Sequence, residues 1–591
     1  MKRYIYYIAG AICILNSYAS WSKPLARELI PQQSNAPFLQ CSPFHTFYQK
    51  HKDNIENAED PSQHNFAGII NRGDYSLQLR LHLIRNAAKS IDIQTFIWAN
   101  DECGTLVFHE LLKAAQRGVK VRLIIDHIAS LKDSKAIAYL TTASPNIEIK
   151  YYRPNARALK SSIPEYSINA VLFAGGINQR MHNKMMLIDG VLAMTGGRNY
   201  DNHYYNLSTS YNFKDRDVMV IGPVVKQSQA SFERFWEYKH AVSSTDLLDV
   251  VRKLKEHDLS DKSYFSQVAE NDIFAETFSA AEDKTLIKER FIDTLFHSQF
   301  TRYIVDDPGK NNWPWLLKMY GGGKVTRELS FIIKQTEEEL IIQTPYLIVN
   351  RWARRPFKKI RKDHPGVKFI MSTNSFAATD NRMAYSANYR LRSQYIKKLK
   401  FQIYEFMPYP ESISEDFPQY TTMKAKAKTE GLSDPPLFCV HAKSFVMDGR
   451  IAFIGTPNLD PRSFNLNTEE GFLFDDEAIA SALRANILRD TAPKNSWVIA
   501  RRRQLSSEIE NLNRQIEWIS RTLPIDLWPL RYSTCYQLKE GETPTSPRDR
   551  ENFYQRYEDL GLFPGMKADY SSDEFIFSIY KTFGKFMTPA M

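Results

Sequence analysis

The sequence has few cysteines and few long apolar runs. Five cysteines are scattered over 591 residues, without the close spacing at which cysteines ligate a metal ion. The triple glycine at 321–323 lacks the Gly-Lys-Ser/Thr ending of a phosphate-binding loop, so we interpret it as a plain loop. After the N-terminus, no stretch is apolar over the roughly 20 residues that a membrane span requires. These absences argue against a metal ion bound by cysteines, against a phosphate-binding loop at 321–323 and against a membrane span after the N-terminus.

The N-terminus resembles a secretory signal peptide. Lys2 and Arg3 precede an apolar run from Tyr4 to Leu15, and Ser17-Tyr18-Ala19 matches a small-x-small cleavage site. The run is shorter than a membrane span, so residues 1–19 are predicted to be a signal peptide, with an uncleaved anchor as the alternative. We therefore expect an exported protein, periplasmic or secreted.

Length and charge set further bounds. A chain of 591 residues is too long for one ordinary core, so two domains or a duplicated one are expected. The hydrophobic content of 43% is that of a globular protein. A net charge of +10 suits anionic lipid and nucleic acid equally. Loss of the signal peptide would leave four cysteines, either paired as disulfides or free and buried: Cys41, Cys103, Cys439 and Cys535.

One pattern occurs twice. It consists of His-x-Lys, four further residues, Asp-Gly, and a later Gly followed after three positions by Asn. The first copy contains His182, Lys184, Asp189, Gly196 and Asn199, and the second contains His441, Lys443, Asp448, Gly455 and Asn458. In a strand, the His and Lys of each copy would share one face. Lysine offers a fixed positive charge to a phosphate oxygen, and histidine offers a nucleophile or a proton carrier. The Asp-Gly step predicts a hairpin turn.

Helices and strands alternate in both halves, which indicates an α/β architecture. In the first half we predict helices over 75–89 and 101–117 and strands over 91–98 and 119–126; in the second, a helix over 325–338 and strands over 340–346 and 366–371. Gln94-Thr95 recurs as Gln343-Thr344, and Gly118-Val119-Lys120 as Gly366-Val367-Lys368. The number of residues between the two copies is nearly the same for both landmarks (343 − 94 = 249 and 366 − 118 = 248). Such a constant offset indicates an internal duplication. Two such halves are expected to pack about a pseudo-twofold axis, which can bring both His-Lys pairs into one site.

The remaining segments complete the expected domain organisation. We predict an irregular entry segment over 20–65, a first domain over 66–240, a connector over 241–324, a second domain over 325–490 and a helical extension over 491–591. Within these, 411–437 is interpreted as a charged solvated loop, with a flexible rim over the site as the alternative. Residues 497–522 are predicted to be helical. Asp573 to Met587 has apolar residues at helical spacing, which fits either a docked terminal helix or a helix in a membrane interface.

The doubled pattern resembles the signature of the phospholipase D superfamily. Longer segments are similar to bacterial cardiolipin synthases of the C type, and the resemblance covers roughly residues 65–530. Those segments are Ile93–Trp98, Arg117–Val121, Thr373–Asn381, and Asn458–Ser463 running on to Glu469. The resemblance implies two homologous α-β-α sandwich domains related by a pseudo-twofold axis, with the active site at their interface.

The same resemblance implies roles for the motif residues. His182 is expected to attack phosphorus and form a phospho-histidine, while His441 acts as acid and base; no metal or other cofactor is needed. The phosphoryl oxygens are expected to be held by Lys184, Lys443, Asn199 and Asn458. Family members also have a carboxylate downstream of each motif that orients a histidine: Asp215 follows the first and Glu469 the second. Structural roles in the hairpins are expected for Asp189, Asp448, Gly196 and Gly455.

Three functions stay open at this point. The favoured one is phosphatidyl transfer on an anionic glycerophospholipid at a membrane surface, with either an alcohol (cardiolipin synthase) or water (phospholipase D) as acceptor. The second is a metal-independent phosphodiesterase on nucleic acid, which the longer matching segments argue against. The third is a membrane-binding module with an inactive site, which two complete motifs argue against. We expect a monomer with an internal pseudo-dimer, peripherally associated with the membrane and not bound to nucleic acid.

Overall fold

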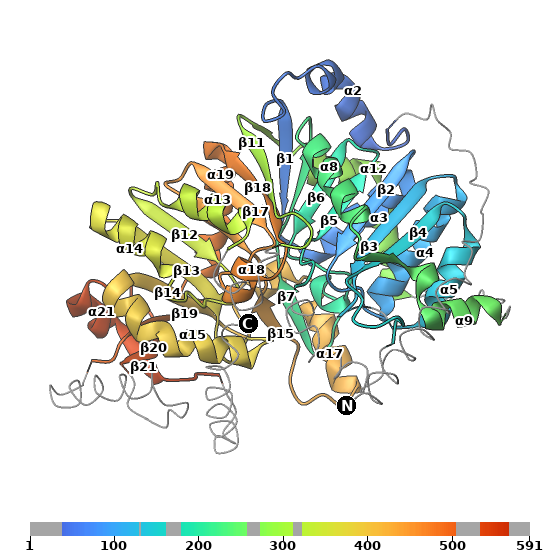
Figure 1. Ribbon diagram of the computed structural model, residues 1–591. Helices are drawn as coiled ribbons and strands as arrows, with labels where there is room; N and C mark the ends of the chain where they lie inside the picture. Colours follow the sequence, from blue (N-terminus) through green and yellow to red (C-terminus); the bar gives the residue numbers. More distant parts are fainter. Residues whose placement is uncertain are drawn as a thin grey trace, which may run out of the picture.

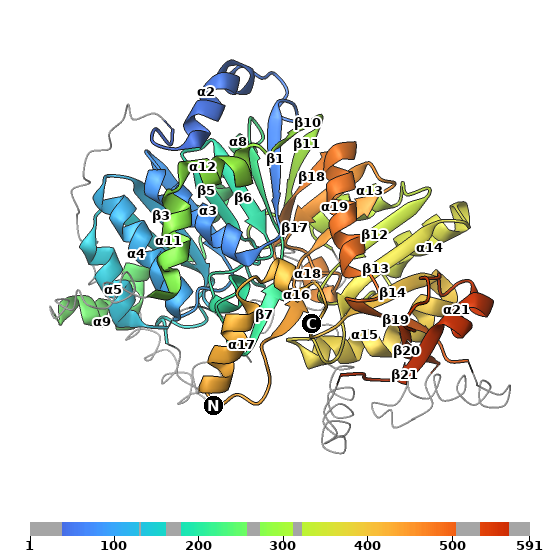
Figure 2. The same ribbon diagram turned by 180° about the vertical axis from the view of Figure 1, so that it is seen from behind.

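A computed structural model describes residues 38–128, 130, 132–160, 179–256, 272–310, 322–503 and 532–565. Two large sheets stand side by side, the first half running from blue to green and the second from yellow to red (Figure 1). The same division into two halves is visible from behind (Figure 2). The predicted α/β class and two-domain organisation are therefore confirmed.

The first sheet has nine strands in the order β10-β1-β8-β6-β5-β2-β3-β4-β9. Their bounds are β1 Asn65–Ile70, β2 Ser90–Thr95, β3 Lys120–Asp126, β4 Ile147–Tyr152, β5 Met185–Ile188, β6 Leu192–Gly196, β8 Asp217–Ile221, β9 Ala241–Ser243 and β10 Phe296–Ser298. The helices of this half are α2 Pro43–Glu56, α3 Gly73–Asn86, α4 Glu102–Gln116, α5 Ser134–Ala143, α8 Val225–Trp236, α9 Leu248–Lys255, α11 Ala275–Glu282 and α12 Lys284–Ile287.

The second sheet has ten strands in the order β11-β18-β17-β16-β12-β13-β14-β19-β20-β21. Their bounds are β11 Thr301–Val305, β12 Glu339–Gln343, β13 Lys368–Asn374, β14 Phe401–Phe406, β16 Ser444–Met447, β17 Ile451–Gly455, β18 Glu470–Asp475, β19 Ser496–Arg501, β20 Ser533–Leu538 and β21 Tyr557–Gly561. Its helices are α13 Lys324–Ile333, α14 Arg354–Asp363, α15 Arg382–Gln394, α16 Ile413–Asp416, α17 Tyr420–Thr429, α18 Pro461–Asn465, α19 Glu477–Asp490 and α21 Arg550–Arg556.

The two sheets have the same topology. The run β1-β8-β6-β5-β2-β3-β4-β9 of the first corresponds strand by strand to β11-β18-β17-β16-β12-β13-β14-β19 of the second. In both, the third and fourth of these strands form the motif hairpin, and the fifth, sixth and seventh are parallel. The predicted internal duplication is therefore present in the fold.

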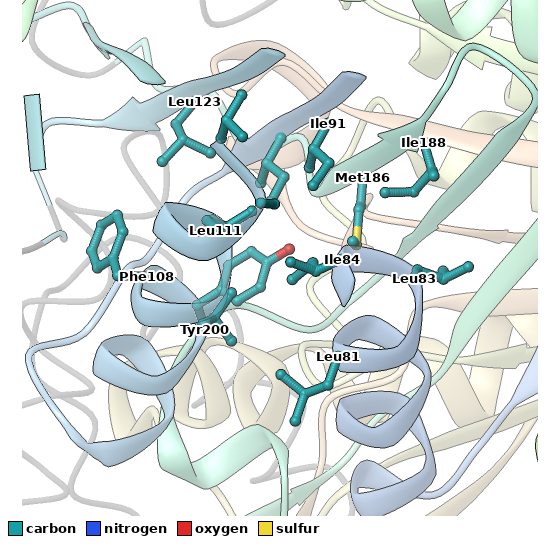
Figure 3. Packing of buried hydrophobic residues seen from close by; sticks show 14 of the residues in the cluster. Leu81, Leu83, Ile84, Ile91, Phe108, Leu111, Leu123, Met186, Ile188 and Tyr200 are labelled. Atoms are coloured by element: carbon teal, nitrogen blue, oxygen red, sulfur yellow. The ribbon is translucent and has the colours of Figure 1, made fainter. Parts of the chain in front are cut away.

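Each sheet is covered by helices on both faces. On the outer face of the first sheet, leucines and isoleucines of α3 and α4 pack against β2, β3 and β5, with Leu81, Ile84, Leu111, Ile91 and Met186 pointing into one apolar layer (Figure 3). A second cluster lies between the halves and combines side chains of α8 and the first sheet with those of α19 and the second. Because this shared core joins the halves, the α-β-α sandwiches pack as one body.

A two-stranded parallel sheet also joins the halves. β7 (Tyr211–Lys214) pairs with β15 (Leu437–Val440), which directly precedes the second motif. The segment before β15 reaches across as well: α17 lies against the first half in both views, and Thr209 Oγ1 donates to Glu430 Oε2 (2.6 Å) (Figures 1 and 2). The prediction of a solvated loop over 411–437 is wrong here, since α16 and α17 form a helical bridge.

Two further predictions about the ends are corrected. The entry segment is not irregular throughout, because Ser42 caps and Pro43 starts α2, whose Phe44, Tyr48 and Ile55 are buried. The extension from 491 is not helical throughout: in its described part β19, β20 and β21 prolong the second sheet, and α21 is a short helix between β20 and β21. The predicted helix over 497–522 therefore begins as a strand, and residues 504–522, the signal peptide and Asp573 to Met587 lie outside the described residues. β9, β10 and β11 likewise make the connector part of both sheets.

The four cysteines are free thiols in this structure. Cys41 is exposed, and the other three are buried: Cys103, Cys439 and Cys535. Burial raises the pKa of the Cys103 thiol well above its usual value. Of the two sequence-based alternatives, disulfides or free thiols, the structure has free thiols. Among the residues that the structure describes, no helix combines the length and apolar character needed to cross a membrane.

Candidate active site

Each motif hairpin turns at its Asp-Gly step. Asp189 (φ +53°) and Gly190 (φ +71°) have positive φ angles, as do Asp448 (φ +51°) and Gly449 (φ +67°). Two consecutive positive φ angles define the turn type that suits the twist of hairpin strands. The Asp carboxylates accept from three consecutive backbone N–H groups in each half: those of Ala88, Lys89 and Ser90 in the first, and Glu337, Glu338 and Glu339 in the second. These carboxylates therefore tie each hairpin to the start of the neighbouring strand.

The histidines and lysines precede the hairpin strands, contrary to the expectation that they lie in them. β5 begins at Met185 and β16 at Ser444. The other half fixes the segment instead: His182 N donates to Thr468 O (3.0 Å), and His441 N donates to Lys214 O (2.8 Å). These backbone bonds replace the sheet ladder that a strand would have used, so the position of each motif depends on the opposite half.

Each catalytic candidate histidine pairs with a carboxylate of the other half. His182 Nδ1 lies 2.9 Å from Glu469 Oε2, and His441 Nδ1 lies 2.7 Å from Asp215 Oδ2. The sequence had assigned Asp215 to the first motif and Glu469 to the second, by their order in the chain. The structure crosses these partners, because the two motifs meet at the interface of the halves. With each Nδ1 beside a carboxylate, Nε2 of His182 is left to face a substrate, whereas Nε2 of His441 also lies 3.0 Å from Lys443 Nζ.

Glycine allows the Asp215–His441 pair to form. A Cβ atom on Gly197 would lie 2.1 Å from Asp215 Oδ1, which is well inside van der Waals contact. A Cβ atom on Gly196 would lie 2.2 Å from Arg216 O, and one on Gly455 would lie 2.3 Å from Glu470 O. The glycines that trail each motif are therefore needed for the close approach of the carboxylate-bearing strand.

Gly197→Ala should reduce turnover while the protein stays folded. The added methyl group displaces the Asp215 carboxylate from His441, and loss of such an orienting carboxylate costs roughly 100-fold or more in kcat. Steady-state rates on a phosphodiester and thermal unfolding curves are to be measured side by side. Gly366→Ala is the matched control, because no atom lies within 4 Å of its added Cβ. Equal rates for the two variants would contradict this account of Gly197.

Both motif lysines are buried and have lowered pKa values. Burial and the neighbouring charge of Lys443 lower the pKa of Lys184 to about 7, and burial lowers that of Lys443 to about 8. Lys184 Nζ donates to His182 O (2.9 Å), and Lys443 Nζ donates to His441 O. Since the charge of Lys443 acts on both Lys184 and His182 of the other motif, the two His-Lys pairs share one site. A bound phosphate diester would supply the negative charge that this site favours.

The two histidine–carboxylate pairs differ in charge. Burial raises the pKa of Glu469 to about 7. The pKa of Asp215, which burial alone would raise, is instead held well below its usual range by His441 and Lys443. Burial and the charges of Lys184 and Lys443 lower the pKa of His182 far below 6.5; the pKa of His441 is also lowered, but the charge of Asp215 opposes that change. His182 is therefore the neutral imidazole. The negative charge of Asp215 makes His441 the easier of the two histidines to protonate.

The two motif asparagines are not equivalent. Asn199 is satisfied within its own half, accepting from Ile97 N (3.0 Å) and donating to Tyr204 OH (2.8 Å). The Oδ1 atom of Asn458 is buried and has no hydrogen-bond partner among the described residues. The structure therefore brings Asn458 to the site as a free polar group, whereas contact of Asn199 with phosphate would require it to change partners.

Sequence reasoning missed the buried residues that follow each carboxylate. Glu470 accepts from Asn183 Nδ2 (3.0 Å) and from Lys184 N (2.8 Å), and Tyr303 OH also donates to it (2.6 Å). At the equivalent position, Arg216 Nη1 donates to Ser444 Oγ (2.6 Å). The sequence contains a signal for these residues, because a charged residue next to a run of apolar strand residues is rarely buried without a partner. Arg216 directly precedes β8, and Glu470 is the first residue of β18.

A further buried ion pair supports Glu469. Lys310 Nζ lies 2.8 Å from Asp306 Oδ2, and that same oxygen accepts from Glu469 N (3.1 Å). Both residues belong to the segment after β11, which the sequence had placed in the connector. No group of three or more His, Cys, Asp or Glu side chains that could hold a metal ion occurs in the part of the chain that the structure describes.

Comparison with known proteins identifies the family. A family model described as "Cardiolipin synthase, PLD-like domain" matches residues 81–236 and 329–491, more than half of the chain. The chain belongs to the cardiolipin synthase-like family of the phospholipase D superfamily. The matched ranges cover both His-Lys motifs and both carboxylates of this cardiolipin synthase-like protein, so its two halves each contain one phospholipase D-like segment.

Individual proteins similar to this chain include one named as a cardiolipin synthase. Cardiolipin synthase C of Escherichia coli is 31% identical over 416 residues, covering 68% of this chain and 80% of that protein. An uncharacterized protein of Helicobacter pylori is 29% identical over 472 residues, covering 77% of this chain and 85% of that protein. Among solved structures, phosphatidylserine synthase of Haemophilus influenzae is 13% identical, with a TM-score of 0.46 and coverage of 80% of this chain and 98% of that one.

Proposed function

We propose that this protein is a phosphatidyltransferase that moves the phosphatidyl group of an anionic glycerophospholipid to an acceptor hydroxyl at a membrane surface. The observation that supports this most strongly is the crossed pair of contacts, His182–Glu469 and His441–Asp215, beside two buried lysines. Two oriented imidazoles next to fixed positive charge are the groups that a phosphodiester exchange needs. The named relatives, which include a cardiolipin synthase, support a phospholipid as the substrate.

The proposed reaction has two steps. His182 Nε2 attacks phosphorus, the bond from phosphorus to the head-group oxygen breaks, and His441 donates its proton to that oxygen. An acceptor hydroxyl then attacks phosphorus, the phosphorus–nitrogen bond breaks, and His441 takes the acceptor's proton. Lys184, Lys443 and Asn458 bind the non-bridging oxygens. The acceptor that we propose is the glycerol head group of a second lipid, which gives cardiolipin; water would give phosphatidic acid.

Product analysis tests this proposal. The protein without residues 1–19 is incubated with phosphatidylglycerol liposomes and no added metal, and the products are separated by mass. Cardiolipin and free glycerol, both absent with His182→Ala and His441→Ala, are expected. Phosphatidic acid as the main product would make the enzyme a phospholipase D. Absence of any lipid product, with cleavage of oligonucleotides instead, would contradict the proposal. Export to the periplasm or medium stays a prediction, to be checked by cell fractionation.

The rate should fall on the alkaline side of neutrality. Lys184 and Lys443, with pKa values near 7 and 8, lose their positive charge as the pH rises, and the phosphodiester then loses its counter-charges. Because kcat/KM reports the free enzyme, we expect it to decline between pH 7 and pH 9. The profile is to be measured from pH 6 to 9.5 on a soluble phosphodiester, with unfolding followed at each pH. A kcat/KM that is constant up to pH 9.5 would be inconsistent with these lysines as the phosphate-binding charges.

A further inference from the structure

An apolar cavity of about 230 Å³ opens beside the second motif. It lies between α13, the N-terminal end of α14 and strands of the second sheet, with walls formed by Leu329, Ile333, Ala353, Phe357, Phe453 and Leu459. An apolar cavity of about 150 Å³ is already large enough to bind benzene. This cavity is therefore large enough for a segment of hydrocarbon chain.

The lining of the cavity also includes two residues of the candidate active site. Lys443 and Asn458 are both part of the lining. The buried Oδ1 atom of Asn458 has no hydrogen-bond partner among the described residues, and Lys443 carries the positive charge proposed to bind phosphate. A ligand that combines a phosphate with a hydrocarbon chain matches this combination of a phosphate-binding pair and apolar walls.

The first half packs the equivalent region differently. Ten residues of α3 are buried, among them Leu77, Leu79 and Leu81, because α11 packs against it. In α13, the counterpart of α3, only Val325 and Ile333 are buried, and Phe331 is 68% exposed. Among the residues that the structure describes, the space beside the sheet is therefore filled by core side chains in the first half and left open in the second.

The surroundings of the cavity suit an anionic lipid surface. Trp352, which lines the cavity, is 46% exposed, and the Arg355 guanidinium lies 3.6 Å from its ring centroid. The exposed side of α14, at the outer edge of the second half in both views, also has Lys358 and Lys359 (Figures 1 and 2). Tryptophan and clustered basic side chains are the groups that proteins place at a membrane interface containing anionic lipid.

We infer that the cavity holds one acyl chain of the lipid whose phosphodiester is bound at Lys443 and Asn458. This inference rests on the proposed function and adds to it the part of the substrate that is recognised away from the reacting atoms. The chain enters beside Trp352, where the basic face of α14 meets the membrane. The substrate is then selected for its long chain as well as for its phosphate.

The test fills the cavity from two walls. Ser330→Trp (from α13) and Ala353→Trp (from α14) each put an indole into the space that the chain would occupy. Phe331→Trp is the matched control, since Phe331 neighbours Ser330 but is exposed and is not part of the lining. For each protein, kcat/KM is measured on dioleoyl phosphatidylglycerol in mixed micelles and on dibutyryl phosphatidylglycerol, whose short chains can fill much less of the cavity.

The expected result is a change in the ratio of the two rates. The ratio of long-chain to short-chain kcat/KM should fall at least tenfold in Ser330→Trp and Ala353→Trp, mainly through KM, and stay within twofold of wild type in Phe331→Trp. An unchanged ratio in Ser330→Trp and Ala353→Trp, with kcat/KM either kept on both substrates or lowered equally on both, would overturn the inference. The wild-type activity would then still uphold the proposed function. A wild-type protein inactive on both lipids would instead contradict the proposed function itself.

Discussion

His441→Ala should accumulate a phosphorylated form of the protein, and His182→Ala should form none. With an activated diester such as a p-nitrophenyl phosphodiester, the leaving group needs no proton, so His182 can still attack. Without His441, no base activates the acceptor, and the phospho-histidine on His182 persists. Both substitutions should lower the steady-state rate on lipid by roughly 10³-fold or more, as expected for groups that act as a unit. Intact-protein mass spectrometry after acid-free quenching measures the adduct.

The double variant and the hairpin residue provide the controls. His182→Ala combined with His441→Ala should show no adduct, which assigns the label to His182. Asp448→Asn, which alters a carboxylate bonded to backbone N–H groups and not to either histidine, should still turn over. An adduct in His182→Ala but not in His441→Ala would reverse the proposed roles of the two histidines.

Asp215→Asn should be far more harmful than Glu469→Gln. Asp215 stays ionised beside His441 and stabilises the protonated imidazole, so the neutral amide removes a charge that the acid step uses. Loss of such a carboxylate costs about 10⁴-fold in a well-studied triad. Burial brings the pKa of Glu469 to about 7, so near neutrality this group is already partly uncharged, and a glutamine oxygen can still accept from His182 Nδ1. We expect roughly tenfold loss for Glu469→Gln.

The comparison is made at pH 6.5 and 8 on one soluble diester. Glu469→Gln should approach wild type at the lower pH, where Glu469 is mostly protonated, whereas Asp215→Asn should be impaired equally at both. Circular dichroism shows whether each variant is folded. Similar losses for the two variants at both pH values would refute the asymmetry between the pairs.

Much of this arrangement could be predicted from the sequence because it depends on local spacing. The Asp-Gly turns, the alternating helices and strands and the repeated landmarks each involve neighbouring residues, and the structure contains them. The partner of each histidine could not be found that way: Asp215 follows His182 in the chain but contacts His441. Proximity across an interface is set by how the halves pack, and spacing within one half carries no information about it.

The errors have physical causes as well. The segment 411–437 looks like a loop because its polar and basic residues show no apolar periodicity, yet contacts with the first half, such as Lys214 with Asp416, stabilise it as α16 and α17. The sequence predicts a helical tail after 490, but the open edge of β14 pairs with β19 as a further strand. In both places tertiary contacts outweigh local preference.

The crossed carboxylates bear on how the two halves became different. In a symmetric pair of identical subunits, any substitution would appear at both histidines at once, so neither could be improved for attack without the other changing in the same way. Joining the copies in one chain removes that constraint. This protein has an Asp in one pair and a Glu in the other, and Arg216 in one half occupies the position that Glu470 has in the other. Each half supplies the carboxylate that sets the charge and orientation of the histidine in the other half. The different roles of the two histidines therefore depend on both halves being encoded in one chain.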